Sequence, residues 1–175
     1  TTSKNPRSTV ATVTEIYDYL RLLYARIGQI YCPNHHEKIE SSSISQIVDA
    51  IMLMPERSRI QIVAPIVKDK KGTHKKLIDK LIKDGYIRFK IDGELYEVGD
   101  IPELDKNKKH SISVIIDRIV IKEGIETRLA DSLETSLNLS NNDLVEIDDV
   151  KEETTQLFST KYSCKHCDFT LGDRS

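Results

Sequence analysis

The stretch Tyr86-Ile-Arg-Phe-Lys-Ile-Asp-Gly-Glu-Leu-Tyr-Glu-Val98 decides the fold, because it predicts two paired strands. Every second residue of its first half is apolar (Ile87, Phe89 and Ile91), which is the period of a half-buried strand. Asp92-Gly93 is typical of the tight two-residue turn of a β-hairpin. Residues 94–98 are therefore expected to pair back on the first strand.

Apolar patterns on both sides of this hairpin predict an α+β fold. The longest expected strand, residues 111–121, is apolar on both faces, which indicates a central position in the sheet. Residues 59–67 form another expected strand, and Pro65 favours its end or an edge position. The other patterns predict helices over 12–27, 44–54, 73–84 and 125–139, strands over 144–147 and 156–162, and loops over 68–72 and 148–153. We expect a mixed β-sheet with helices packed against it.

Charge is distributed unevenly along the 175 residues, although the totals nearly cancel at 26 Lys and Arg against 28 Asp and Glu. Residues 57–122 contain 16 basic and 10 acidic residues, whereas residues 123–156 contain 2 basic and 10 acidic ones. A basic segment beside an acidic one is typical of a nucleic-acid footprint or a protein-docking face, and equally of two solvated faces that neutralise each other. Few aromatic residues and no Trp argue against a stacking platform for single-stranded nucleic acid.

Composition also bears on where the protein works. No apolar run reaches the roughly 18 residues that a membrane-spanning helix needs, and the first residues lack the pattern of a secretion signal. We therefore expect a cytoplasmic protein without a membrane partner. Three cysteines cannot all pair, so a disulfide scaffold is disfavoured, and an intracellular metal site or a reduced thiol is favoured.

Two short ligand pairs, separated by most of the chain, predict a structural zinc site. Together they supply the four N and S ligands of a closed tetrahedron: Cys32, His35, Cys164 and Cys167. These ligands would have to meet in space, so residues 36–163 are expected to leave and return at one place, as a domain inserted between the two halves of a zinc knuckle. The alternatives are a redox pair at the last two cysteines, unrelated thiols, or His36 or His166 as the histidine ligand.

Motifs for catalysis and nucleotide binding are absent from the sequence. It contains no G-x-x-x-x-G-K-[ST] phosphate loop, no G-x-G-x-x-G and no G-x-S-x-G elbow. The carboxylates Asp148 and Asp149 lie in an acidic run and are expected to be solvated, as are His74 and His110 beside their lysines. These residues are therefore expected to form a binding or structural module and not an enzyme.

Nine motifs match one protein family in order along essentially the whole chain. They are Asn5 through Arg26, Cys32 through His35, Lys71 through His74, Gly85 through Arg88, Asp92 through Glu94, Leu104 through His110, Val114 through Arg118, Arg128 through Thr135, and Phe158 through Cys167. In this combination the chain resembles the UvrA family, the damage-sensing ATPases of bacterial nucleotide excision repair. The resemblance implies that the full-length protein is dimeric, binds DNA and carries two ABC-type ATPase modules. The ATP site would lie outside this stretch, and the fragment could remain a monomer.

The same resemblance implies a domain organisation and a partner. Residues 1–40 resemble the first ATPase module with half of its zinc knuckle, residues 41–156 the UvrB-binding domain, and residues 157–175 a return strand with the other half of the knuckle. The expected function is docking on UvrB, which helps to load UvrB at DNA lesions. The alternative is direct DNA binding by the basic segment 57–122.

Three basic residues are the candidates for contact with UvrB. In the family the contact is polar and arginines on the sheet matter, and the matching positions are Arg88 and Arg118. Lys90 lies beside Arg88 on the polar face of the same expected strand. Arginine suits bidentate pairing with a carboxylate across an interface. The alternative is an internal salt bridge, for example with Asp92 or Asp117.

Overall fold

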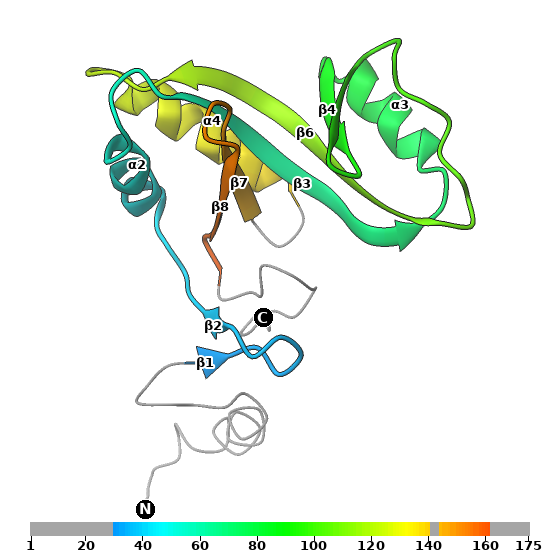
Figure 1. Ribbon diagram of the computed structural model, residues 1–175, viewed down its shortest axis with the longest axis horizontal. Coiled ribbons are helices and arrows are strands. Elements are labelled where there is room, and N and C mark those ends of the chain that lie inside the picture. Colours follow the sequence, from blue (N-terminus) through cyan, green and yellow to red (C-terminus); the bar gives the residue numbers. More distant parts are fainter. Residues whose placement is uncertain (1–29, 141–143, 162–175) are drawn as a thin grey trace, which may run out of the picture. The chain divides into compact units, whose positions relative to one another are not determined.

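The computed structural model describes residues 30–140 and 144–161, and the chain divides into two compact units (Figure 1). The larger unit is Ser41–Lys161, and the smaller one comprises Thr1–Glu40 and Tyr162–Ser175. In the larger unit the described residues form a β-sheet with three helices, which confirms the α+β class. The helix predicted over 12–27 lies outside the described residues.

The sheet of the larger unit has six strands among the described residues, in the order β5-β4-β6-β3-β7-β8. Every neighbouring pair is antiparallel, so the prediction of a mixed sheet was wrong. Parallel neighbours need a crossover connection, whereas here the chain between β3 and β6 turns back through α3 and the hairpin. The bounds are β3 Arg59–Lys71, β4 Arg88–Ile91, β5 Glu94–Glu97, β6 Lys109–Val120, β7 Leu144–Asp149 and β8 Thr154–Ser159.

Strands β3 and β6 form the long central ribbon of the sheet (Figure 1). The interior position predicted for residues 111–121 is confirmed, because β6 lies between β4 and β3. The loop predicted over 68–72 was wrong, since β3 continues to Lys71 and stays paired with β6. Pro65 lies beyond the last β3 residue that pairs with β7, Val63, and a register shift follows it. A proline that cannot donate to the ladder fits at such an irregularity.

The helices begin and end close to the predicted positions: α2 is Ile44–Met52, α3 is Lys75–Lys83 and α4 is Glu126–Leu139. Ser43 caps α2 in a reciprocal capping box with Gln46, as the sequence predicts. Gly85 follows the end of α3 with a φ of 105°, a conformation that favours glycine. None of the described helices is long and apolar enough to cross a membrane.

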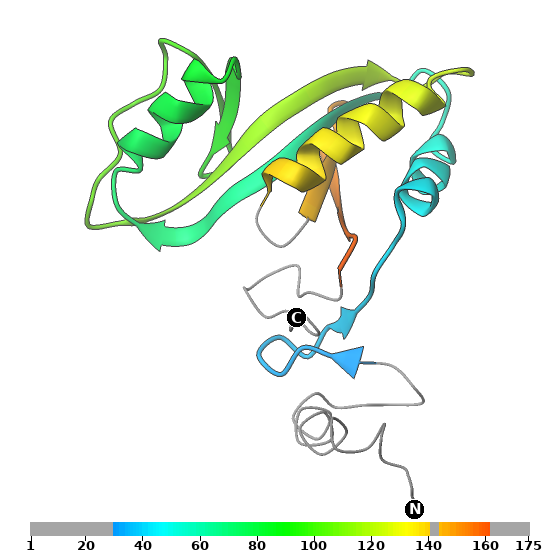
Figure 2. The same cartoon turned by 180° about the vertical axis from the view of Figure 1, so that it is seen from behind.

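Two clusters of buried apolar side chains form the core of the larger unit. The first packs α2 and α4 against β3, β6 and β7, and it includes Ile47, Ile62, Ile119, Leu133 and Ile147. The second packs α3 against the hairpin and the adjoining half of β6, and it includes Leu81, Phe89 and Ile112. Figure 2 shows α4 running along β3 and β6, so the helices bury one set of alternating strand residues and leave the other set for polar contacts.

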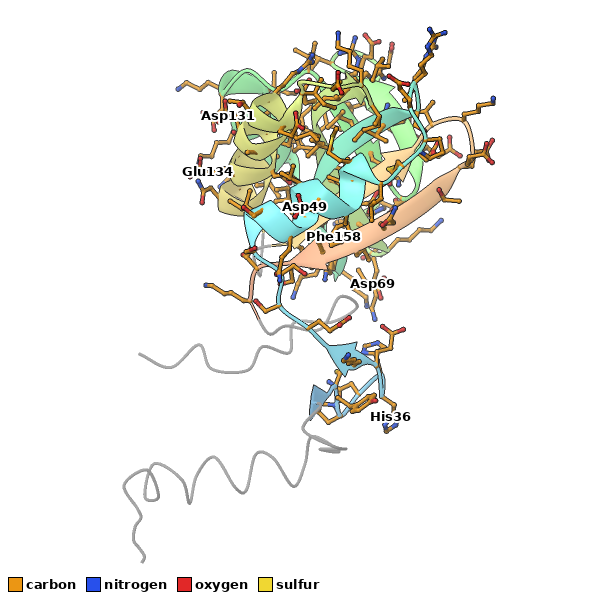
Figure 3. The ribbon with its side chains drawn as sticks, turned by 90° about the vertical axis from the view of Figure 1, so that its left-hand side faces the viewer. His36, Asp49, Asp69, Asp131, Glu134 and Phe158 are labelled. Atoms are coloured by element: carbon orange, nitrogen blue, oxygen red, sulfur yellow. The ribbon has the colours of Figure 1, made fainter. Side chains whose placement is uncertain are left out.

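The outward sides of α2 and α4 carry acidic residues. Asp49 on α2 and Asp131 and Glu134 on α4 are exposed and point away from the sheet in Figure 3. Phe158 on β8 lies close to α2 and packs against the first cluster. Of the acidic residues predicted in 123–156, only Glu126, Asp131 and Glu134 lie on α4, whereas Glu146, Asp148 and Asp149 lie on β7.

Candidate functional site

Arg88 on β4 and Arg118 on β6 line one shallow hollow of about 270 Å³. The hollow lies where Gly85 and Ile87 lead into β4 and where β6 runs past Ile116. Ile87, which also lines the hollow, is 55% exposed, so the lining is partly apolar. The structure thus brings together two arginines that are 30 positions apart in the sequence.

The guanidinium of Arg88 is incompletely satisfied. Its Nε is buried and has no hydrogen-bond partner among the described residues. Arg88 Nε forms an internal ion pair with Glu97 Oε1 on the paired strand β5, but the two atoms lie 3.8 Å apart, which is longer than a hydrogen bond. A buried charged donor without an acceptor costs free energy unless a ligand, water or partner supplies one.

Arg118 is exposed on β6, and the neighbouring carboxylate is already occupied. Asp117 accepts hydrogen bonds from Arg128 Nη2 at 2.9 Å and Arg128 Nε at 3.1 Å. Ser132 on α4 donates to the same carboxylate at 2.8 Å. Burial of Asp117 acts to raise its pKa, but these donors outweigh it and hold the pKa below its ordinary value. The internal salt bridge considered between Arg118 and Asp117 is therefore absent among the described residues.

Lys90 is held inside an ion-pair network on the sheet. Its Nζ donates to Glu146 Oε2 at 2.7 Å and to Asp148 Oδ2 at 3.0 Å. Burial acts to lower the pKa of Lys90, but the two hydrogen bonds outweigh it and the pKa is raised. Burial and the hydrogen bond with Asp148 raise the pKa of Glu146 to about 7. Lys90 joins β4 to β7 in this way, and its contact with a partner stays a prediction.

His110 at the start of β6 is a structural residue whose role the sequence did not reveal. It is buried, so the expectation of a solvated ring was wrong. Its Nδ1 lies 2.7 Å from Asp92 Oδ2, and its Nε2 lies 2.7 Å from the carbonyl oxygen of Asp105. Because both neighbours are acceptors, both ring nitrogens must donate, which describes the protonated ring. The alternative pairing of Asp92 with Arg88 is accordingly not seen; Asp92 is used by His110.

The smaller unit contains a hairpin that carries the first predicted pair of zinc ligands. Strand β1, Ile30–Tyr31, pairs antiparallel with β2, Lys38–Ile39. The turn is closed by backbone bonds from Cys32 N to Glu37 O and from His36 N to Cys32 O, both at 2.8 Å. Cys32 Sγ lies 3.9 Å from His35 Nδ1, close to the roughly 3.6 Å that separates S and N ligands of a tetrahedral zinc. The residues present therefore fit half of a zinc site.

The second predicted pair of ligands, Cys164 and Cys167, lies outside the described residues. Within residues 30–140 and 144–161 no group of three or more His, Cys, Asp or Glu side chains is placed to hold a metal ion. The inserted-knuckle arrangement and the four-ligand zinc site therefore stay predictions.

Comparisons with known proteins give a consistent result. A family model described as "UvrA interaction domain" matches residues 42–151. UvrABC system protein A of Staphylococcus aureus (strain N315) is 56% identical over 173 residues, and that of Listeria monocytogenes (strain EGD-e) is 57% identical over 173 residues. The alignments cover 99% of this chain and 18% of each relative. The chain thus spans under a fifth of the length of these relatives, and the matching model is an interaction domain rather than an enzyme domain.

Proposed function

Because the chain belongs to the UvrA interaction domain family, we propose that its larger unit is a docking module that binds UvrB and helps to load it at DNA lesions. This role lies within nucleotide excision repair, in agreement with the resemblance in the sequence. ATP hydrolysis, damage recognition and dimerisation are proposed for the full-length protein, of which this chain matches only a part.

The observation that carries the proposal is the hollow shared by Arg88 and Arg118. The buried Nε of Arg88, which lacks a hydrogen-bond acceptor, and the exposed guanidinium of Arg118 can donate hydrogen bonds to carboxylates of a partner. Paired guanidinium groups recognise carboxylates through charge-assisted, often bidentate hydrogen bonds. The exposed Ile87, which lines the same hollow, offers an apolar contact, and such a mixture of polar and apolar groups is typical of an interface.

The test is a calorimetric titration of the chain with UvrB. We expect Arg88→Ala and Arg118→Ala each to weaken binding by about 30-fold, the equivalent of roughly 2 kcal/mol for a truncated interface arginine. Lys151→Ala is the matched control, because this exposed cation lies in the turn between β7 and β8, outside the hollow. Unchanged affinity in both arginine variants, with the melting temperature preserved, would overturn the proposal.

We also propose that the smaller unit binds one structural zinc ion through Cys32, His35, Cys164 and Cys167. The closeness of Cys32 Sγ and His35 Nδ1 supports the first half of this ligand set. The ends of the larger unit support the inserted arrangement, because Ser42 N donates to Ser159 O and Ser41 Oγ to Thr160 O, both at 2.8 Å. When bound, zinc would cross-link the two chain segments that flank the docking module.

A further inference from the structure

A group of lysines gathers at the end of the sheet where β3 finishes and β6 begins. We call six exposed lysines of this group the lysine tip: Lys71, Lys75, Lys76, Lys106, Lys108 and Lys109. Lys71 and Lys109 stand directly opposite each other in the β3–β6 register. Like charges placed opposite in an antiparallel pair destabilise it, so the fold tolerates a repulsive pair at this end.

The lysines of the tip come from three segments, namely the end of β3, the start of α3 and the residues around the start of β6. Contacts around His110 bring these segments together. His110 Nε2 lies 2.7 Å from the carbonyl oxygen of Asp105, which fixes the segment before β6. His74, at the start of α3, has its Nε2 3.0 Å from the carbonyl oxygen of Lys70 on β3. The rings of His74 and His110 meet edge to face with centroids 6.3 Å apart. Lysines from β3, α3 and the segment before β6 are thus held on one scaffold.

The charge of the lysine tip is not neutralised locally. Segments 68–76 and 105–110 contain eight lysines and two aspartates. None of the six lysines of the tip forms an ion pair among the described residues. The acidic residues noted on α2 and α4, Asp49, Asp131 and Glu134, belong to other elements. A concentrated positive field in which lysines outnumber acidic residues suits an extended anionic partner.

We propose that the lysine tip contacts the phosphate backbone of duplex DNA. Lysine acts as a point charge, which suits the closely spaced phosphates of a duplex. The segments of the tip contain no Phe, Tyr or Trp, so the stacking that recognises single-stranded bases is not available there. An acidic protein partner would be expected to find arginines and apolar anchors, and those lie at the hollow of Arg88 and Arg118 instead. The contact is therefore independent of base sequence.

The two surfaces are far enough apart to be used together. Lys109 and Arg118 are separated by nine residues of the same strand, which corresponds to about 30 Å at the rise of a β-strand. A protein partner at the hollow would thus leave the lysine tip accessible. This inference goes beyond the docking function and does not depend on it.

Fluorescence anisotropy of a labelled 20-base-pair duplex, titrated with the full 175-residue chain at several salt concentrations, tests the proposal. We expect binding that weakens log-linearly with salt, with a slope of about 0.9 for each phosphate neutralised. The double variant Lys71→Glu with Lys109→Glu should lose at least about tenfold in affinity and lower the slope by about 2. Because the double variant exchanges one like-charge cross-strand pair for another, we expect folding to stay intact, which circular dichroism checks. Lys106→Gln with Lys108→Gln is the second variant.

The control variant Lys151→Glu reverses the charge of an exposed lysine outside the tip. Its affinity for the duplex should differ from that of the parent chain by less than twofold. Arg88→Ala should bind the duplex normally, which separates this result from failure of UvrB docking. The proposal is overturned if the chain does not bind the duplex in low salt, or if Lys151→Glu weakens binding as much as the tip variants do. It is also overturned if poly-glutamate of equal charge displaces the duplex and binds more tightly, because the partner would then be an acidic polypeptide.

Discussion

At the scale of single residues, Asp92 shows how one side chain fixes a turn and a neighbouring strand together. Its φ of 52° and the φ of 87° at Gly93 give the left-handed pair that a tight hairpin turn requires. Its carboxylate accepts from the backbone N of Ser111 at 2.8 Å and faces the ring of His110 at 2.7 Å. The hairpin is therefore tied to β6 by a charged side chain in addition to the strand ladder.

The His110 contact predicts that the larger unit loses stability as the pH rises above about 6.5. The hydrogen bond to Asp92, and then the one to the carbonyl of Asp105, raise the pKa of His110 above its ordinary value. When the pKa of a group is higher in the folded protein than in the unfolded chain, its protonated form stabilises the fold. For His110 this stabilisation is fully present below the unfolded pKa of about 6.5 and is lost as the pH rises through the folded pKa. Urea unfolding between pH 5.5 and 8.5 should show that decline. His110→Gln should flatten the part above about pH 7, because Glu146, whose pKa is raised to about 7, contributes its own decline only up to that pH.

Two further variants separate the source of this pH dependence. Asp92→Asn keeps a residue that tolerates a positive φ but removes the charge, so it should also flatten the decline. His74→Gln, whose ring contacts His110, should leave most of the decline in place. If His110→Gln and the parent chain show the same slope, the buried ring is not the titrating group.

Single-residue roles were predictable from the sequence only where they depend on near neighbours. Asp92-Gly93 and the Ser43 capping box are read from adjacent positions, and both are confirmed. The partner of Asp117, in contrast, is Arg128 on α4, and that contact depends on how the helix packs on β6. The same holds for Lys90, whose carboxylate partners lie 56 and 58 residues away. The partner in such a pair depends on the tertiary structure, so no local sequence pattern predicts it.

At the scale of elements, β3 shows why a charged segment can be misread as a loop. Residues 68–71 are rich in lysine, and a polar run between two apolar patterns predicts a connection. In the structure they extend β3, because β6 continues beside them and supplies the ladder bonds. Sequence propensity is overridden here by a paired strand, as is common for strands. The prediction of a mixed sheet was wrong for a related reason, because the relative direction of two strands depends on how the chain connects them.

The capping box of α2 predicts a measurable loss when Ser43 is replaced. Ser43 Oγ accepts from Gln46 N at 3.1 Å, and Gln46 Oε1 accepts from Ser43 N at 2.8 Å. Ser43→Ala removes the first of these bonds and should lower the free energy of unfolding by about 1 kcal/mol in urea denaturation. Ser45→Ala is the matched control, because the same change two residues later removes no cap and favours the helix slightly. Equal losses in the two variants would contradict the capping role.

At the scale of the whole molecule, the larger unit closes on itself at the point where the chain enters and leaves it. Ser41 and Ser42 are hydrogen bonded to Thr160 and Ser159, which brings together positions more than 115 residues apart. Its core clusters contain none of the predicted zinc ligands. A unit with its own core and adjacent ends can be carried by a host domain without depending on it. The insertion between two halves of a zinc knuckle, which the ligand spacing and the family resemblance both predict, stays a prediction.

This independence makes a prediction about metal removal. Reduced, carefully prepared chain should contain about one zinc ion, as measured by metal analysis. Chelation should change the smaller unit but leave the melting temperature of the larger unit within about 2 °C, because no ligand lies in its core. Zinc-free protein, or collapse of the sheet on chelation, would show that the ligands are not assembled in this way.

The adjacent histidines provide the sharpest control, since they differ in their position relative to the thiol. His35→Ala should lose the zinc, because His35 Nδ1 lies 3.9 Å from Cys32 Sγ and completes the two-residue spacing. His36→Ala should keep it, because His36 occupies the next position, with a φ of 56° in the turn. If His36→Ala loses the metal and His35→Ala retains it, His36 is the fourth ligand. The hairpin would then bind zinc with a different spacing, while the proposed insertion of the larger unit would be unaffected.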